Sequence, residues 1–104
     1  MIKVFNGLAY NTDTATHLCE IPCSKCRGDF GWHETSLYRT KKGAYFISGH
    51  GGPASIWRQA EGSNGWTSGD GLRVIDAEEA RGYAEQAGLE VDEMIDAGFA
   101  VEEA

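Results

Sequence analysis

The hydrophobic pattern of this chain changes its period once, near Asp76. Before that residue, short segments rich in β-branched and aromatic residues alternate with glycine-containing turns, which is typical of strands. After it, apolar residues recur at intervals of three and four, which is typical of a helix. Strands followed by helices predict an α+β fold. We expect an antiparallel sheet of about five short strands, with one or two C-terminal helices packed on one face.

The clearest strand signal is a pair of segments, 35–40 and 44–48, joined by a short turn that contains Gly43. An opening hairpin is predicted at Asn6-Gly7, because both residue types tolerate the positive φ angles of a tight turn. Further strands are expected over 15–21, 54–59 and 72–75, with a glycine-rich loop over 62–71.

The helical region begins with a capping signal. Asp76 and Glu79 have the spacing of a capping box, and Gly88 is a natural left-handed stop, so we expect a helix over 77–87. A shorter helix is expected over 91–97. Its apolar residues Val91, Met94 and Ile95 would lie on one side.

Length and composition indicate one domain. The 104 residues are 41% hydrophobic, which is a globular value, and they divide into a strand-rich region 1–75 and an acidic helical region 76–104. No stretch approaches the roughly 20 apolar residues that cross a bilayer. The N-terminal residues lack the pattern of a secretion signal, so we expect a cytoplasmic protein without membrane contact.

The negative charge is concentrated near the end of the chain. Residues 61–104 hold twelve Asp/Glu and two Lys/Arg, a balance of −10. Residues 1–60 hold four Asp/Glu and seven Lys/Arg, so the net charge of −7 comes from residues 61–104. Such a field repels nucleic acid and attracts basic protein surfaces; the alternative is a solvated helix that aids solubility. The carboxylates expected to bind a partner are Glu78, Glu79, Glu85, Glu90, Asp92, Glu93 and Asp96.

Three cysteines lie close together, at Cys19, Cys23 and Cys26. With His17 or His33 they could hold zinc tetrahedrally, since Cys23 and Cys26 have the spacing of a zinc knuckle. Cys19 is not part of such a pair, however, whereas the ligands of four-ligand zinc sites usually come as two pairs. Reduced thiols, or a redox pair of Cys23 and Cys26, are the other interpretations. We therefore predict no cofactor and leave zinc open.

No motif predicts catalysis. His50-Gly51-Gly52 resembles loops that present backbone N–H groups to an oxyanion, but no nucleophile elbow accompanies it. Phosphate-loop, dinucleotide and His-Glu-x-x-His motifs are absent from the sequence. Gly49, Gly51 and Gly52 are expected to turn the chain sharply between strands. We therefore expect a protein that is not an enzyme.

Basic and aromatic residues alternate in the middle of the chain, around Lys41 and Lys42. Such a pattern can bind nucleic acid. Aromatic residues in alternating strands are more often core, however, and lysines at a hairpin tip protect an exposed edge. With the negative net charge, direct binding of nucleic acid is disfavoured.

Several stretches together resemble a family of small proteins from phages and bacterial mobile elements that includes anti-CRISPR inhibitors. The resemblance covers most of the chain in order, although the cysteine cluster departs from it. The matching stretches are Asn6-Gly7, 10–16, Asp29-Phe30, 34–46, 51–55 and 77–80.

The resemblance implies a small phage-derived inhibitor that binds a bacterial CRISPR-Cas complex, or another defence protein, through protein–protein contacts. An acidic helix can mimic nucleic acid in the basic channel of such a complex. The alternative function is a zinc-stabilised, non-catalytic adaptor that binds its partner through the aromatic hairpin 35–48.

Overall fold

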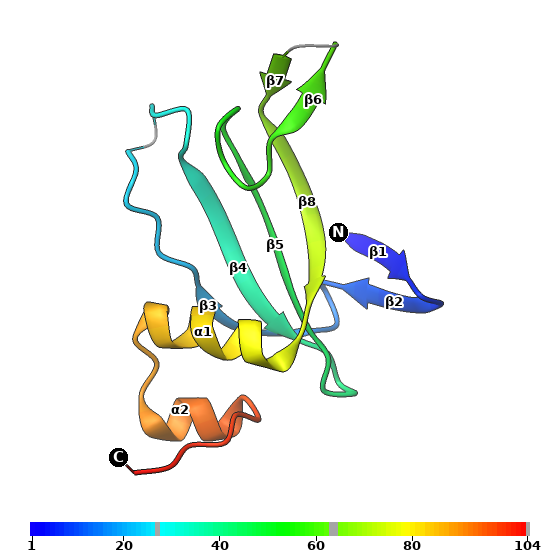
Figure 1. Ribbon diagram of the computed structural model, residues 1–104. Helices are drawn as coiled ribbons and strands as arrows, with labels where there is room; N and C mark the ends of the chain where they lie inside the picture. Colours follow the sequence, from blue (N-terminus) through cyan, green and yellow to red (C-terminus); the bar gives the residue numbers. More distant parts are fainter. Residues whose placement is uncertain (27, 63–64, 104) are drawn as a thin grey trace.

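The computed structural model describes residues 1–26, 28–62 and 65–103, and these residues form an α+β fold (Figure 1). The strands of this part of the chain are β1 (Ile2–Phe5), β2 (Leu8–Asn11), β3 (Thr16–Glu20), β4 (His33–Arg39), β5 (Tyr45–Gly51), β6 (Gln59–Glu61), β7 (Gly65–Thr67) and β8 (Gly69–Ile75). The helices are α1 (Ala77–Ala87) and α2 (Val91–Asp96). None of the described helices is long and apolar enough to span a membrane.

The central element is a four-stranded antiparallel sheet with the order β3-β4-β5-β8. The predicted hairpin is its middle pair: Leu37 lies opposite Ile47, and Arg39 lies opposite Tyr45. β8 pairs along the whole of β5, from Tyr45 opposite Ile75 to Gly51 opposite Gly69. The strands β1 and β2, and the strands β6 and β7, form two separate hairpins.

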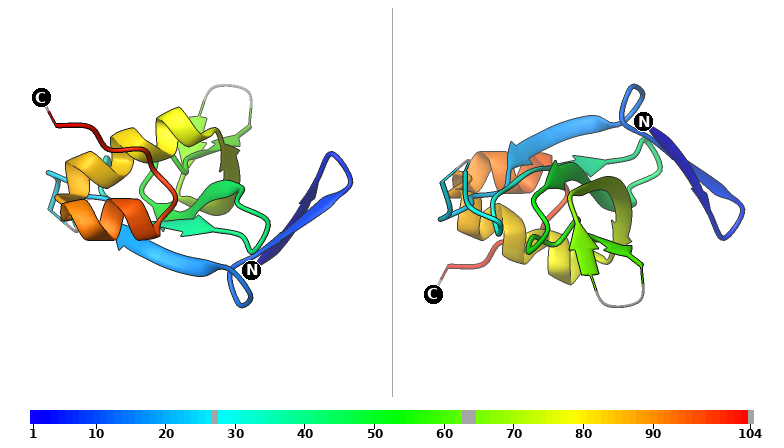
Figure 2. Two further views of the ribbon diagram at one scale, coloured as in Figure 1. Left: turned by 90° about the horizontal axis from the view of Figure 1, so that it is seen from below. Right: turned by 90° about the horizontal axis from the view of Figure 1, so that it is seen from above.

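Both faces of the sheet are covered, but by different parts of the chain. On one face Leu37 and Ile47, which are fully buried, pack against Ala80 and Ala84 of α1. On the other face Phe46 packs with a residue of the N-terminal hairpin, Tyr10, and with Leu72. The helices lie side by side on the first face, and the β1–β2 hairpin projects away from the sheet (Figure 2).

The predicted turn and helix boundaries are confirmed. Asn6 and Gly7 have φ angles of 51° and 76°, which the two-residue turn between β1 and β2 requires. The Asp76 side chain accepts a hydrogen bond from the Glu79 backbone N–H, and Gly88 ends α1 in the left-handed conformation.

The predicted strand over 54–59 is wrong. Residues 53–57 form turns, in which the Ser55 hydroxyl donates to the Gly52 carbonyl and accepts from the Trp57 N–H. The expected loop over 62–71 is also partly wrong, because β7 and the start of β8 lie within it. Residues 63 and 64 of that loop lie outside the described residues.

Candidate functional site: the acidic helical surface

All seven acidic residues that the sequence proposes for partner binding are exposed on the helical layer. Glu78 and Glu79 lie in the first turn of α1, and Glu85 lies in its second half. Glu90 precedes α2 as its N-cap, and α2 itself carries Asp92, Glu93 and Asp96. We call these seven residues the acidic helical surface. Arg81 is the single Lys or Arg in the sequence from 76 to 104.

Small side chains beneath this surface hold α1 against the sheet. Ala80 and Ala84 have no exposed area, so the helix backbone approaches the strands closely. In α2 only Met94 is buried. The spacing of Val91, Met94 and Ile95 places them on one side of α2, but only Met94 reaches the core, because Val91 and Ile95 are 62% and 57% exposed. A helix of one and a half turns has room for a single side chain against the core.

The acidic residues are not equivalent. Glu93 stabilises the start of α2, because its carboxylate accepts a hydrogen bond of 3.0 Å from the Glu90 backbone N–H. Glu85 lies 3.6 Å from Arg81. Within the described part of the chain, no hydrogen bond or ion pair engages the side chains of Asp92 and Asp96. The carboxylates of Glu78 and Glu79 are likewise unengaged there, so four of the seven are available to a partner, and Asp92 and Asp96 are the two on α2.

The structure does not assemble the proposed zinc ligands. His17 bonds to Glu20 at 3.1 Å, and His33 bonds to Thr35 at 2.9 Å. Among residues 1–26, 28–62 and 65–103, no three His, Cys, Asp or Glu side chains are placed to hold one metal ion. The three cysteines are free thiols.

Cys19 differs from the other two cysteines. It packs against the core under the helices, whereas Cys26 is exposed. Burial raises the pKa of the Cys19 thiol, and the nearby carboxylates of Glu20 and Glu93 raise it further. The thiolate is the form that binds metal and reacts. Because the raised pKa leaves less of Cys19 as thiolate, this residue is suited to packing in the core.

The aromatic hairpin proposed for the adaptor does not present an aromatic surface. Tyr45 is 5% exposed, and Phe46 is fully buried between Tyr10 and Tyr38. Lys41 and Lys42 are exposed in the turn that follows β4. The aromatic residues therefore form core, and the two lysines are a separate feature at the tip.

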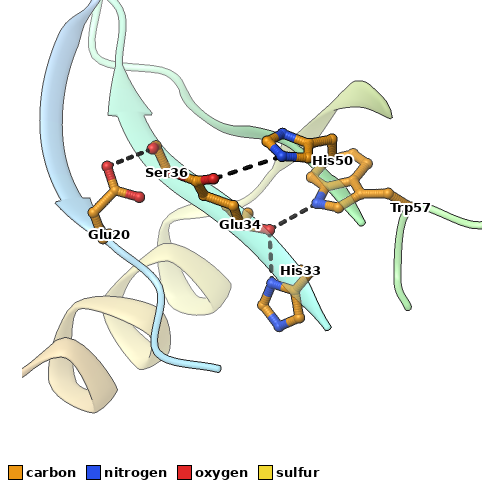
Figure 3. Close-up of polar contacts among 7 residues, drawn as sticks. Glu20, His33, Glu34, Ser36, His50 and Trp57 are labelled. Atoms are coloured by element: carbon orange, nitrogen blue, oxygen red, sulfur yellow. Dashed lines mark hydrogen bonds and ion pairs between the residues drawn. The ribbon is translucent and has the colours of Figure 1, made fainter. Parts of the chain in front are cut away.

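A buried polar network that the sequence did not reveal lies at the end of the sheet opposite this tip (Figure 3). The Trp57 indole N–H donates to the Thr35 hydroxyl oxygen at 2.7 Å, and His33 Nδ1 lies 2.9 Å from the same oxygen. Burial lowers the pKa of His33, so the neutral ring is favoured, and its tautomer decides whether Nδ1 donates to the Thr35 hydroxyl or accepts from it. Thr35 is 1% exposed, and the network fixes Trp57 against the sheet.

The His50-Gly51-Gly52 segment does not present its amides to an oxyanion. The Gly52 N–H donates to the Trp32 carbonyl at 2.8 Å, and Gly51 pairs with His33 in the sheet. The expected role of the glycines as a turn is wrong for Gly49 and Gly51, which lie within β5. A Cβ at Gly49 would overlap the Glu34 carbonyl, so close approach of the backbone requires glycine there.

His50 belongs to an open cleft of about 780 Å³ at this end of the sheet. Its Nε2 lies 3.5 Å from Glu34 (Figure 3). Its ring also packs edge-on against Trp32. Both members of the His50–Glu34 pair are more than half exposed, so solvent weakens their interaction.

In comparisons with protein families, with curated proteins and with solved structures, no match to this chain was found. The resemblance to small phage and mobile-element proteins therefore remains a hypothesis about the partner.

Proposed function

We propose that this protein is a non-catalytic binding protein that docks its acidic helical surface on a basic surface of another protein. The observation that carries the proposal is the exposure of seven carboxylates on two adjacent helices, with one arginine among them. Charges of one sign on one surface steer association with a surface of the opposite sign.

The partner we propose is a protein whose basic surface holds nucleic acid. Carboxylates on a rigid helix can occupy the positions that phosphates take in such a channel. The family resemblance narrows this to a CRISPR-Cas complex or another bacterial defence protein, with this chain acting as its inhibitor in the host cytoplasm. The inhibitor would contact protein, and neither nucleic acid nor membrane.

A plaque assay tests this function. A bacterial host with an active CRISPR system is infected with a targeted phage, with and without expression of the protein. We expect more plaques when the wild-type protein is present, and fewer again for Asp92→Lys combined with Asp96→Lys. No gain in plaques across the common CRISPR types would contradict the inhibitor assignment.

The matched control reverses two charges elsewhere. Lys41 and Lys42 are exposed in the β4–β5 turn, and no ion pair engages them within the described residues. Reversing both to Glu changes the net charge by the same magnitude. We expect this variant to keep the activity of the wild type.

A further inference from the structure

A shallow groove crosses the helical layer between the second half of α1, α2 and the chain that follows α2. Its volume is about 290 Å³, which is near the lower limit of about 300 Å³ for ligand pockets. This size suits one inserted side chain. The apolar residues that line the groove are Leu89, Val91, Met94, Ala100 and Val101.

Three of these apolar residues, Val91, Ala100 and Val101, are exposed to water, and the two valines have the larger side chains. Val91 is 62% exposed and Val101 is 42% exposed, whereas Met94 is 7% exposed and lies at the core. Each Å² of apolar surface removed from water contributes about 25 cal/mol. A partner side chain that covered both valines would therefore add affinity that does not depend on salt.

The rim of the groove is acidic. Glu85 and Glu102 line it, and the exposed Asp92 lies outside the lining, one residue after Val91 on α2. Arg81 also lines it, but its Nε lies 3.6 Å from the Glu85 carboxylate, which offsets its charge. An apolar centre inside a charged rim is the usual arrangement of a protein–protein interface.

From this arrangement we propose that the groove binds an apolar side chain of the partner, and that Lys or Arg residues flank that side chain in the partner's sequence. The apolar side chain covers Val91 and Val101, and the flanking cations lie against Glu102 and Asp92. This inference rests on the proposed function and adds the chemistry of the segment that is recognised.

The test uses two synthetic peptides and the isotope-labelled full chain. One peptide is lysine-rich with a single central leucine, and the other has serine in place of that leucine, so both carry the same charge. Binding is followed by amide chemical shifts in an NMR titration. We expect the leucine peptide to bind about tenfold more tightly, with the largest shift changes at Val91 and Val101.

Matched variants of the protein test whether the leucine of the peptide binds in the groove. Val91→Thr combined with Val101→Thr keeps the branched shape while making the groove polar, and we expect it to remove the preference for leucine. Ile95→Thr is the control, because Ile95 is 57% exposed on the same helix and does not line the groove. Amide spectra of both variants establish that they are folded.

The outcomes separate the two proposals. Equal binding of the two peptides, or loss of the leucine preference in Ile95→Thr alone, overturns the groove and leaves the acidic helical surface standing. If neither peptide binds, the proposed function fails as well. Leucine preference that survives the double threonine variant also overturns the groove, because the side chain then lies elsewhere.

Discussion

The Tyr45 hydroxyl donates a buried hydrogen bond of 2.6 Å to the Ala97 carbonyl and so joins the central sheet to the end of α2. The ring of Tyr45 also stacks on Phe99, with centroids 5.1 Å apart. Residues separated by half the chain therefore fix the position of the acidic helical surface. Without these contacts α2 would be held mainly by Met94.

The first prediction concerns this bond. Tyr45→Phe keeps the ring but leaves the Ala97 carbonyl without its partner, so we expect the free energy of unfolding to fall by about 1–3 kcal/mol. Urea denaturation measures it. Tyr83→Phe is the control, because Tyr83 is only partly buried and no hydrogen bond of its hydroxyl is seen within the described residues. Equal losses in the two variants would contradict the role of the bond.

The second prediction concerns Thr35. Thr35→Val keeps the shape of the side chain but removes the only acceptor that the described residues give the indole N–H of Trp57. We expect a loss of about 1–3 kcal/mol in urea denaturation. Ser36→Ala is the neighbouring control: it removes a hydrogen bond to the exposed Glu20 and should cost less. A Thr35→Val protein as stable as Ser36→Ala would refute the network.

The third prediction concerns pH. The pKa of His33 is lowered from 6.5 in the folded state by burial, so the unfolded chain binds more protons than the folded chain between the two pKa values. The contribution of His33 to stability is complete above pH 6.5 and declines as the pH falls toward the folded-state pKa. The difference in unfolding free energy between the wild type and His33→Gln should therefore shrink on acidification. A difference that is constant from pH 7.5 down to pH 5 would contradict this.

The parts of the fold that could be predicted from the sequence are those held by interactions between residues close together in the chain. Local signals were sufficient for α1, because Asp76, Glu79 and Gly88 fix its ends within a few residues of chain. The central hairpin was likewise encoded by its own residues. By contrast, the segment 54–59 has the composition of a strand but forms turns. The hydrogen bonds of Ser55 and the contact of Trp57 with Thr35, which is distant in sequence, determine its conformation.

The candidate site was predicted in part. Acidic residues in a helical pattern are exposed almost by default, so the exposure of all seven carboxylates could be predicted, and their role in binding stays a prediction. It could not show that Val91 and Val101 would form a groove, since they are brought together by the turn of the chain after α2. Nor could the sequence show that His17 would bond to Glu20 and that His33 would bond to Thr35.

The fourth prediction concerns thiol reactivity. Burial and the charges of Glu20 and Glu93 raise the pKa of Cys19, so less of it is thiolate at pH 8. Alkylation by iodoacetamide, followed by peptide mass spectrometry, should modify the exposed Cys26 first and Cys19 last. Glu20→Gln should speed alkylation of Cys19, because it removes one of the two negative charges that raise the pKa of this thiol. Cys19 reacting as fast as Cys26 in the native protein would be inconsistent with its packing.

The fifth prediction tests the acidic helical surface itself. Tagged wild-type protein, Asp92→Lys with Asp96→Lys, and Lys41→Glu with Lys42→Glu are compared in quantitative affinity purification from a bacterial host with an active CRISPR system. Contacts between opposite charges are screened by salt, since the Debye length falls to about 3 Å at 1 M. Specific partners should therefore be released as salt rises.

The decisive comparison is between the two charge-reversed proteins in physiological salt. We expect the wild type and Lys41→Glu with Lys42→Glu to retain a partner with a basic, nucleic-acid-binding surface. Asp92→Lys with Asp96→Lys should retain it on the order of tenfold less. Retention of that partner by the aspartate variant together with its loss from the lysine variant would contradict the account, because binding would then depend on the β4–β5 turn.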